Sequence, residues 1–156
     1  MATTTLTLTR DVAAMPDTVW QVLTDVRGSA DSLSGVSSIE MLTDGPYGVG
    51  TRWRETRSIM GGSETEEMEV VEVEAPRRTA IRSVARGAVY RTVFVLAPTG
   101  DGSRLTMEFG GTDPDAGLVK RLLMAVPTRI GLMMVRKMMT RDLRDIAAAA
   151  EGRATA

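Results

Sequence analysis

The feature that most constrains this chain is its methionine-rich C-terminal stretch, residues 117–153, which reads GLVKRLLMAVPTRIGLMMVRKMMTRDLRDIAAAAEGR. Asp113-Pro114-Asp115 places acidic residues where the positive end of a helix dipole would lie. We predict one long helix over residues 115–151, kinked near Pro127, because proline removes a backbone hydrogen bond and clashes one turn back. So long a helix needs a second layer to cover its apolar side.

The two halves of this predicted helix differ. After Pro127, a spacing of about 100° per residue gathers apolar side chains on one face, namely Leu132, Val135, Met139, Leu143 and Ile146. Lys137, Arg141 and Arg144 fall on the opposite face. The earlier half has little polar face, with Leu122, Leu123, Met124, Val126, Ile130, Met133 and Met134. That half is therefore buried on several sides, or it faces something apolar outside this chain. Its methionines would either form an adaptable cavity wall or fill the core.

The chain before this helix is mainly a series of strands. Residues 3–10 alternate between leucine and threonine, which predicts a half-buried strand. Residues 16–27 form an amphipathic helix beginning at Pro16, and a short helical turn follows at 29–33. Six predicted strands occupy residues 36–111, separated by glycine-rich turns: 36–43, 51–60, 64–75, 79–85, 89–97 and 104–110. We predict a single α+β domain over residues 1–156, with an antiparallel meander curved around the long helix and a ligand cavity between them.

Composition excludes several kinds of chemistry. The chain has no cysteine and no histidine, which removes cysteine nucleophiles, Ser-His-Asp triads and the usual zinc ligands. We therefore predict neither a metal nor a cofactor. The net charge is −1, so nothing favours nucleic acid as a partner. No uncharged apolar run approaches the roughly 20 residues that span a bilayer, and no signal peptide is evident, so we expect a cytoplasmic protein without stable membrane insertion.

Several short segments, in this order, carry a family resemblance. They are residues 15–25 (MPDTVWQVLTD), 48–53 (GVGTRW), 72–78 (EVEAPRR), 98–106 (PTGDGSRLT) and 143–146 (LRDI). The chain resembles the START-like, or SRPBCC, helix-grip superfamily, and within it the polyketide cyclase/dehydrase and lipid transport group. The resemblance covers nearly the whole chain. It implies a seven-stranded antiparallel sheet of the START/Bet v 1-like kind gripping a long C-terminal helix, with a cavity between them.

One departure from the family pattern concerns the region after the first helix. Many relatives carry a tryptophan there, whereas this sequence reads Ser32-Leu33-Ser34-Gly35-Val36. The resemblance implies binding of lipids, sterols, polyketides, quinones or plant hormones, and cyclase activity in some members. Because of the departure, we expect different packing at that end of the cavity and do not transfer a relative's ligand.

Strand parity provides candidate cavity residues, provided that these faces are concave. The predicted ligand-binding residues are Trp53, Glu55, Arg57, Ile59, Ile81, Tyr90, Thr92, Phe94, Met107, Phe109, Val126, Ile130 and Met134. A mostly apolar lining with a few polar groups is typical of a small-molecule pocket. A slip of one residue in any strand would invert the assignment.

Glu55, Arg57 and Tyr90 are the candidates for catalysis. Glu55 and Arg57 lie two residues apart in one predicted strand, so they point the same way and can pair. Arg57 would hold a carbonyl or carboxylate of the ligand, with Glu55 orienting it or accepting a proton. The alternative is a salt bridge at the rim of the sheet, or an outward-facing pair. Tyr90 would donate a hydrogen bond to a ligand, or alternatively keep its hydroxyl in water.

Three functions remain open from the sequence. The first is binding or transport of a hydrophobic, lipid- or polyketide-like molecule in the cavity. The second is an aromatase/cyclase-type enzyme, since that chemistry needs an acid/base group near an enolisable carbon. The third is an interaction module, in which the apolar first half of the helix docks on a partner or on a second copy as a homodimer. The six glutamates of residues 64–74 and the basic helix face are interpreted as solvated surfaces.

Overall fold

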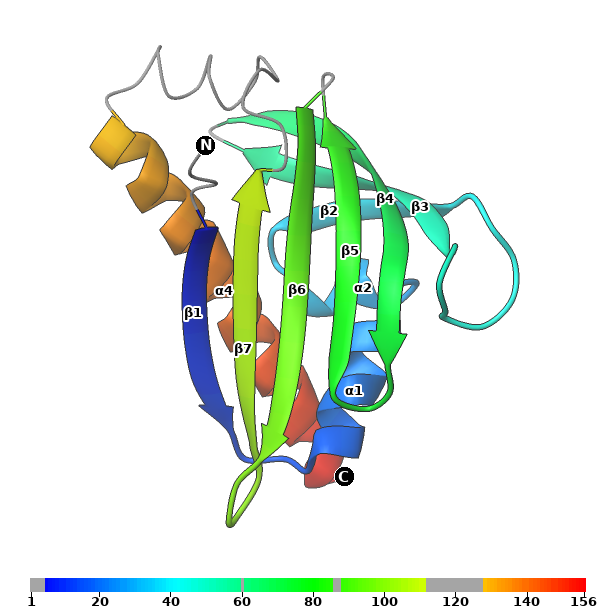
Figure 1. Ribbon diagram of the computed structural model, residues 1–156, viewed down its shortest axis with the longest axis vertical. Helices are drawn as coiled ribbons and strands as arrows, with labels where there is room; N and C mark the ends of the chain where they lie inside the picture. The colour runs from blue at the N-terminus through cyan, green and yellow to red at the C-terminus, as the bar shows by residue number, and fades with distance from the viewer. Residues whose placement is uncertain (1–4, 60, 86–87, 112–127) are drawn as a thin grey trace.

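Seven antiparallel strands form one sheet, and the long C-terminal helix packs against one face of it (Figure 1). The computed structural model describes residues 5–59, 61–85, 88–111 and 128–156. The described elements, in chain order, are β1 (Thr5–Val12), α1 (Pro16–Thr24), α2 (Ser29–Ser32), β2 (Val36–Met41), β3 (Arg52–Ile59), β4 (Gly62–Glu74), β5 (Arg78–Ala85), β6 (Ala88–Pro98), β7 (Ser103–Gly111) and α4 (Thr128–Ala154).

The strand order is β1-β7-β6-β5-β4-β3-β2, so consecutive strands are neighbours except for β1. β1 instead closes against the last strand, with Leu6 opposite Phe109 and Leu8 opposite Met107. Figure 1 shows the sheet curling, with β1, β7, β6 and β5 upright and β2 and β3 running across behind them. The predicted α+β helix-grip fold, with its antiparallel meander and long C-terminal helix, is confirmed.

Some element boundaries differ from those predicted. β1 covers residues 5–12 rather than 3–10. α1 ends at Thr24, three residues before the predicted end, because the Asp25 carboxylate accepts the backbone N–H of Gly28 at 3.1 Å and turns the chain early. α4 runs to Ala154 rather than 151, while the predicted start at 115 and the kink near Pro127 lie outside the described residues.

Two apolar clusters make up the core. The first lies between α4, α1 and the β1–β7–β6 side of the sheet, and its buried members are Val12, Ala14, Val19, Val22, Leu96, Leu105, Met107, Met139, Leu143, Ile146, Ala147 and Ala150. The second lies toward the β2–β5 side and is built on Val26, Trp53, Val70 and Ile81. The helical stripe predicted for the second half of α4 therefore does face the sheet, since Met139, Leu143 and Ile146 are all buried.

The acidic strand β4 does not form one solvated face. Glu64 and Glu66 lie opposite Arg57 and Glu55 of β3, on the side of the helices. Glu67 faces outward, where it pairs with Arg52. The interpretation of all six glutamates as solvent-facing was wrong for the first two, because alternation along a strand sends every second side chain to the inner face.

Gly102, in the turn between β6 and β7, has no room for a side chain. A Cβ there would lie 2.2 Å from the backbone oxygen of Val12, which belongs to the end of β1. We expect Gly102→Ala to lower the free energy of unfolding by about 1–3 kcal/mol, because backbone must move to admit the methyl group. Gly100→Ala in the same turn meets nothing within 4 Å and is the matched control. Urea unfolding of both variants checks this, and equal losses would contradict it.

Candidate functional site

A cavity lies where the two apolar clusters meet, between the inner face of the sheet and the three helices. It encloses about 80 Å³. Its helical wall comes from α1, α2 and α4, and its sheet wall from β3 to β7. The lining residues are Val22, Leu23, Val26, Ser29, Ser32, Leu33, Trp53, Glu55, Arg57, Met68, Ile81, Thr92, Phe94, Met107, Asp142 and Ile146. Most of them are apolar, and the charged ones form a single group.

That group is a triad of Glu55, Arg57 and Asp142. Arg57 Nε donates to Glu55 Oε1 at 2.6 Å, and Arg57 Nη1 donates to Asp142, 2.9 Å from Oδ2. Glu55 Oε2 also accepts the indole Nε1–H of Trp53 at 3.2 Å. The pair on β3 is thereby linked to α4, 85 residues further along the chain. The outward-facing alternative is wrong, because both side chains line the cavity, whereas the ion pair expected in the other alternative is present.

The triad is nearly removed from water. The exposed fractions of the side chains are 15% for Arg57, 7% for Glu55 and 5% for Asp142. Burial lowers the pKa of Arg57, but the charges of Asp142 and Glu55 outweigh it and raise the pKa, so the guanidinium stays charged. Burial raises the pKa of Asp142 above its ordinary value, against the opposing effect of Arg57. A carboxyl group of raised pKa beside a fixed cation can exchange a proton more readily than an exposed one.

Glu66 adds a further carboxyl group beside the triad. It lies directly opposite Glu55 in the β3–β4 ladder. Burial raises its pKa, and the charge of Glu55 raises it further, while Arg57 and a hydrogen bond with Ser83 oppose the change. Within the described residues, three carboxyl groups, those of Glu55, Glu66 and Asp142, therefore lie at this end of the inner face.

Seven of the thirteen predicted ligand-binding residues line the cavity. These are Trp53, Glu55, Arg57, Ile81, Thr92, Phe94 and Met107. They were identified by strand parity, and the observed register keeps them on the inner face of β3, β5, β6 and β7.

The other predicted residues lie elsewhere. Tyr90 is buried and stacks on Phe109 with ring centroids 5.5 Å apart, so neither a water-exposed hydroxyl nor a place in the cavity lining is observed. Ile59, at the end of β3, and Ile130, near the start of α4, are exposed. Met134 is half-buried but does not line the cavity. Val126 lies outside the described residues, together with most of the apolar first half of the predicted helix.

Asp142 is the functional candidate that the sequence reasoning missed. A signal was present, because Asp142 lies three residues after Met139 and four before Ile146, on the apolar stripe of the helix. A charge on such a stripe needs a partner. Arg141 was also misplaced: it was assigned to the solvent face, yet it is half-buried with its guanidinium against Gly35. The α2 residues Ser29 and Ser32 carried no pattern that would have placed them in the lining.

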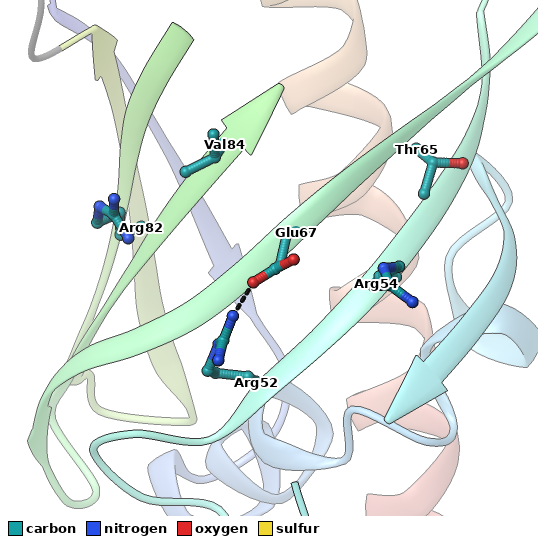
Figure 2. A pocket seen from close by; sticks show the side chains of 6 residues that line it. All are labelled: Arg52, Arg54, Thr65, Glu67, Arg82 and Val84. Carbon is teal, nitrogen blue, oxygen red and sulfur yellow. Dashed lines mark hydrogen bonds and ion pairs between the residues drawn. The ribbon is translucent and has the colours of Figure 1, made fainter. Parts of the chain in front are cut away.

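A second hollow lies on the outer face of the sheet (Figure 2). It holds about 490 Å³, and the side chains around it are Arg52, Arg54, Thr65, Glu67, Arg82 and Val84. Arg52 pairs with Glu67 across it, while Arg54 and Arg82 pair with Glu40 and Glu69 at 3.2 and 3.3 Å. Although larger, this hollow is open to water and lined by exposed ion pairs, which contribute little binding energy. The inner cavity, which is less open and mostly apolar, is the stronger candidate site.

Metal binding and membrane insertion find no support in the described part of the chain. There, no group of three or more acidic side chains is arranged to hold a metal ion. No helix within those residues has the length and hydropathy needed to cross a bilayer.

Comparison with solved structures relates the fold to known proteins. The ZhuI aromatase/cyclase from Streptomyces sp. R1128 is 25% identical, with a TM-score of 0.78, and the match covers 97% of this chain and 96% of that one. The di-domain aromatase/cyclase BexL of the BE-7585A biosynthetic pathway is 19% identical with a TM-score of 0.75, covering 99% of this chain and 50% of that one. Major latex-like protein 151 from Panax ginseng is 13% identical with a TM-score of 0.72, covering 95% and 97%.

Sequence comparison provides the family. No functionally curated protein matches the chain significantly. The sequence profile described as polyketide cyclase / dehydrase and lipid transport matches residues 3–151, which is nearly the full length. The helix-grip fold and the cavity between sheet and C-terminal helix agree with that match. The chain belongs to the polyketide cyclase/dehydrase and lipid transport family.

Proposed function

We propose that this protein binds a small hydrophobic molecule, lipid- or polyketide-like, in the cavity between the sheet and α4. The observation that supports this is the inner cavity itself, with mostly apolar walls and one buried charged group, the triad of Glu55, Arg57 and Asp142. Such a lining gives affinity through the walls and orientation through the polar group. Members of the matched family are described as polyketide cyclases and lipid-transport proteins, which agrees with a ligand of this class.

The size of the cavity bears on how the ligand would bind. Pockets for drug-sized ligands usually hold about 300–1,000 Å³, whereas this one encloses about 80 Å³. A lipid or polyketide would therefore have to displace part of the wall. α2 is a candidate for this movement, because none of its four residues is buried. Its C-terminal end is held to α4 by Asp145, which accepts the backbone N–H and the hydroxyl of Ser34 at 2.8 and 2.6 Å.

Filling the cavity is expected to abolish binding. Thr92 lies on the inner face of β6 and lines the cavity, so Thr92→Phe should occupy the space that the ligand needs. The fluorescence of the neutral apolar dye N-phenyl-1-naphthylamine should rise when the wild-type protein is added. The rise with the variant should be smaller by a factor of at least about ten. Native mass spectrometry of protein purified from cells would show whether a ligand is carried along.

Thr65→Phe is the matched control, since Thr65 is exposed on the outer face of the sheet. It should bind the dye as the wild type does. Absence of dye uptake and of a co-purified ligand in the wild type would overturn the proposed function. Equal loss in both variants would show that the dye does not report on the cavity.

A second candidate is a cyclase-type enzyme acting on a poly-β-ketone. It is favoured by the Arg57 guanidinium lying between two carboxylates, together with the likeness to an aromatase/cyclase at 25% identity. Glu55 or Asp142 would accept a proton from a carbon between two carbonyl groups. Arg57 would stabilise the enolate oxygen that results. The carboxylate substitutions Glu55→Gln and Asp142→Asn should then each reduce turnover of a confirmed substrate by about 10²-fold or more, and unchanged turnover would reject these roles.

A further inference from the structure

The polar end of the cavity offers more hydrogen-bond acceptors than the protein uses. Glu55 and Asp142 both line the cavity, and two carboxylates provide about eight lone-pair positions. Among the residues that the structure describes, three N–H groups donate to them: Nε1 of Trp53 and the Nε and Nη1 of Arg57. A ligand reaching this end of the cavity therefore finds spare acceptor positions on both carboxylates.

Among the residues that the structure describes, negative charge also exceeds positive charge beside the cavity. Glu66 of β4 lies opposite Glu55 on the same face of the sheet, so Glu55, Asp142 and Glu66 bring three carboxyl groups to this end. The described cations that act on them are Arg57 and, at Asp142, Arg141. In a partly buried setting such an imbalance is felt more strongly than in water.

Among the described residues, Arg57 is the one cation that lines the cavity, and it is already engaged. Arg57 holds Glu55 at 2.6 Å and Asp142 at 2.9 Å. A ligand carboxylate could pair with Arg57 only by competing with these two side chains, which are buried and fixed by the fold. Displacing either one would leave a buried carboxylate without its cation, and that is costly.

We propose that this cavity selects ligands whose polar end is a hydrogen-bond donor, a hydroxyl or an ammonium group, and rejects ligands that end in a carboxylate. The proposal rests on the proposed function, because it names the ligand chemistry of the same cavity. It replaces the simpler expectation that Arg57 receives a ligand carboxylate. Arg57 acts instead as the fixed cation that holds the Glu55 and Asp142 side chains in place beside the ligand.

Three ligands with one ring system test this selection: 2-naphthol, 2-naphthylmethylamine and 2-naphthoic acid. Their apolar parts are the same, and at pH 7 their polar ends are a neutral donor, an ammonium and a carboxylate. Isothermal titration calorimetry with the wild-type protein at low ionic strength should show binding of the first two. The naphthoate should bind at least about tenfold more weakly than either. A naphthoate that binds as well as the other two would overturn the proposal while leaving the proposed function standing.

Two variants that each replace a glutamate by glutamine distinguish a charge effect at the cavity from a charge effect elsewhere on the protein. Glu66→Gln removes one inner charge without changing the cavity lining, and Glu67→Gln removes a charge from the outer face of the same strand. Glu66→Gln should reduce the ratio of the amine's affinity to the naphthoate's affinity several-fold. Glu67→Gln should leave that ratio unchanged. Equal effects of the two variants would also overturn the proposal. If none of the three compounds binds and the apolar dye is not taken up either, the proposed function itself fails.

Discussion

Arg57→Met is expected to lower the free energy of unfolding by about 3–5 kcal/mol, because it leaves two buried carboxylates without their cation. Glu55 and Asp142 have almost no contact with water, so solvent cannot replace the lost guanidinium. The methionine has a similar length and fits among apolar neighbours, so lost packing contributes little. Urea unfolding at pH 7, followed by circular dichroism, measures the effect.

Arg54→Met is the control in the same strand. Arg54 faces outward, and it pairs with the exposed Glu40 at 3.2 Å. An exposed ion pair of this kind contributes about 0–1 kcal/mol, so the control should lose far less stability. Similar losses in the two variants would show that the triad does not stabilise the fold as its burial requires.

The stability lost in Arg57→Met should depend on pH, because the lost cation acts on a buried carboxyl group. Arg57 lowers the pKa of Asp142 against the effect of burial, so in the variant that pKa lies further above its value in the unfolded chain. A carboxyl group whose pKa is raised on folding favours the folded state at low pH and opposes it as the pH rises. The difference in the free energy of unfolding between wild type and variant should therefore be smallest near pH 4 and grow toward pH 7. A deficit independent of pH would argue for a packing defect instead.

Met139→Ala is expected to cost about 2–5 kcal/mol of stability, the usual range for truncating a fully buried methionine. Met139 has no exposed surface and packs in the first apolar cluster, between α4 and the sheet. Its loss leaves a cavity between α4 and the sheet that the surrounding side chains close only in part. Thermal or urea unfolding of the variant measures the loss.

Met133→Ala provides the matched control on the same helix. Met133, six residues before Met139, is 67% exposed. Its truncation should change stability by no more than about 0.5 kcal/mol. If the exposed methionine proved as important as the buried one, the observed packing of α4 on the sheet could not be correct.

Local periodicity made most of the fold predictable. The number of strands, their antiparallel order after β1 and the apolar stripe through Met139 and Leu143 all follow from side-chain spacing and turn residues. Boundaries were less predictable, as at α1, where the side chain of Asp25 turns the chain before Gly28. The position of β1 beside β7 does not follow from spacing, because it pairs the first strand of the chain with the last.

The candidate site was predictable only in part, because local periodicity assigns side chains to faces but does not give contacts between distant elements. Alternation along β3 placed Trp53, Glu55 and Arg57 on one face from the sequence alone. Tyr90 satisfies the same parity but lies against Phe109, away from the cavity. Parity assigns a side chain to one face of the sheet. It does not say which part of that face lines a cavity and which part is packed against other side chains.

The sequence by itself determined which residues share a strand face or a helix stripe, since these relations depend on a backbone repeat of two or 3.6 residues. It determined that Glu55 and Arg57 point the same way. Only the tertiary structure decided that Asp142 of α4 meets Arg57 of β3, at 2.9 Å and across 85 residues of sequence. That contact depends on the angle and height at which the helix crosses the sheet, which are set by the packing of the whole core. The same packing buries Glu55 and Arg57 beside Asp142 in the lining of the cavity.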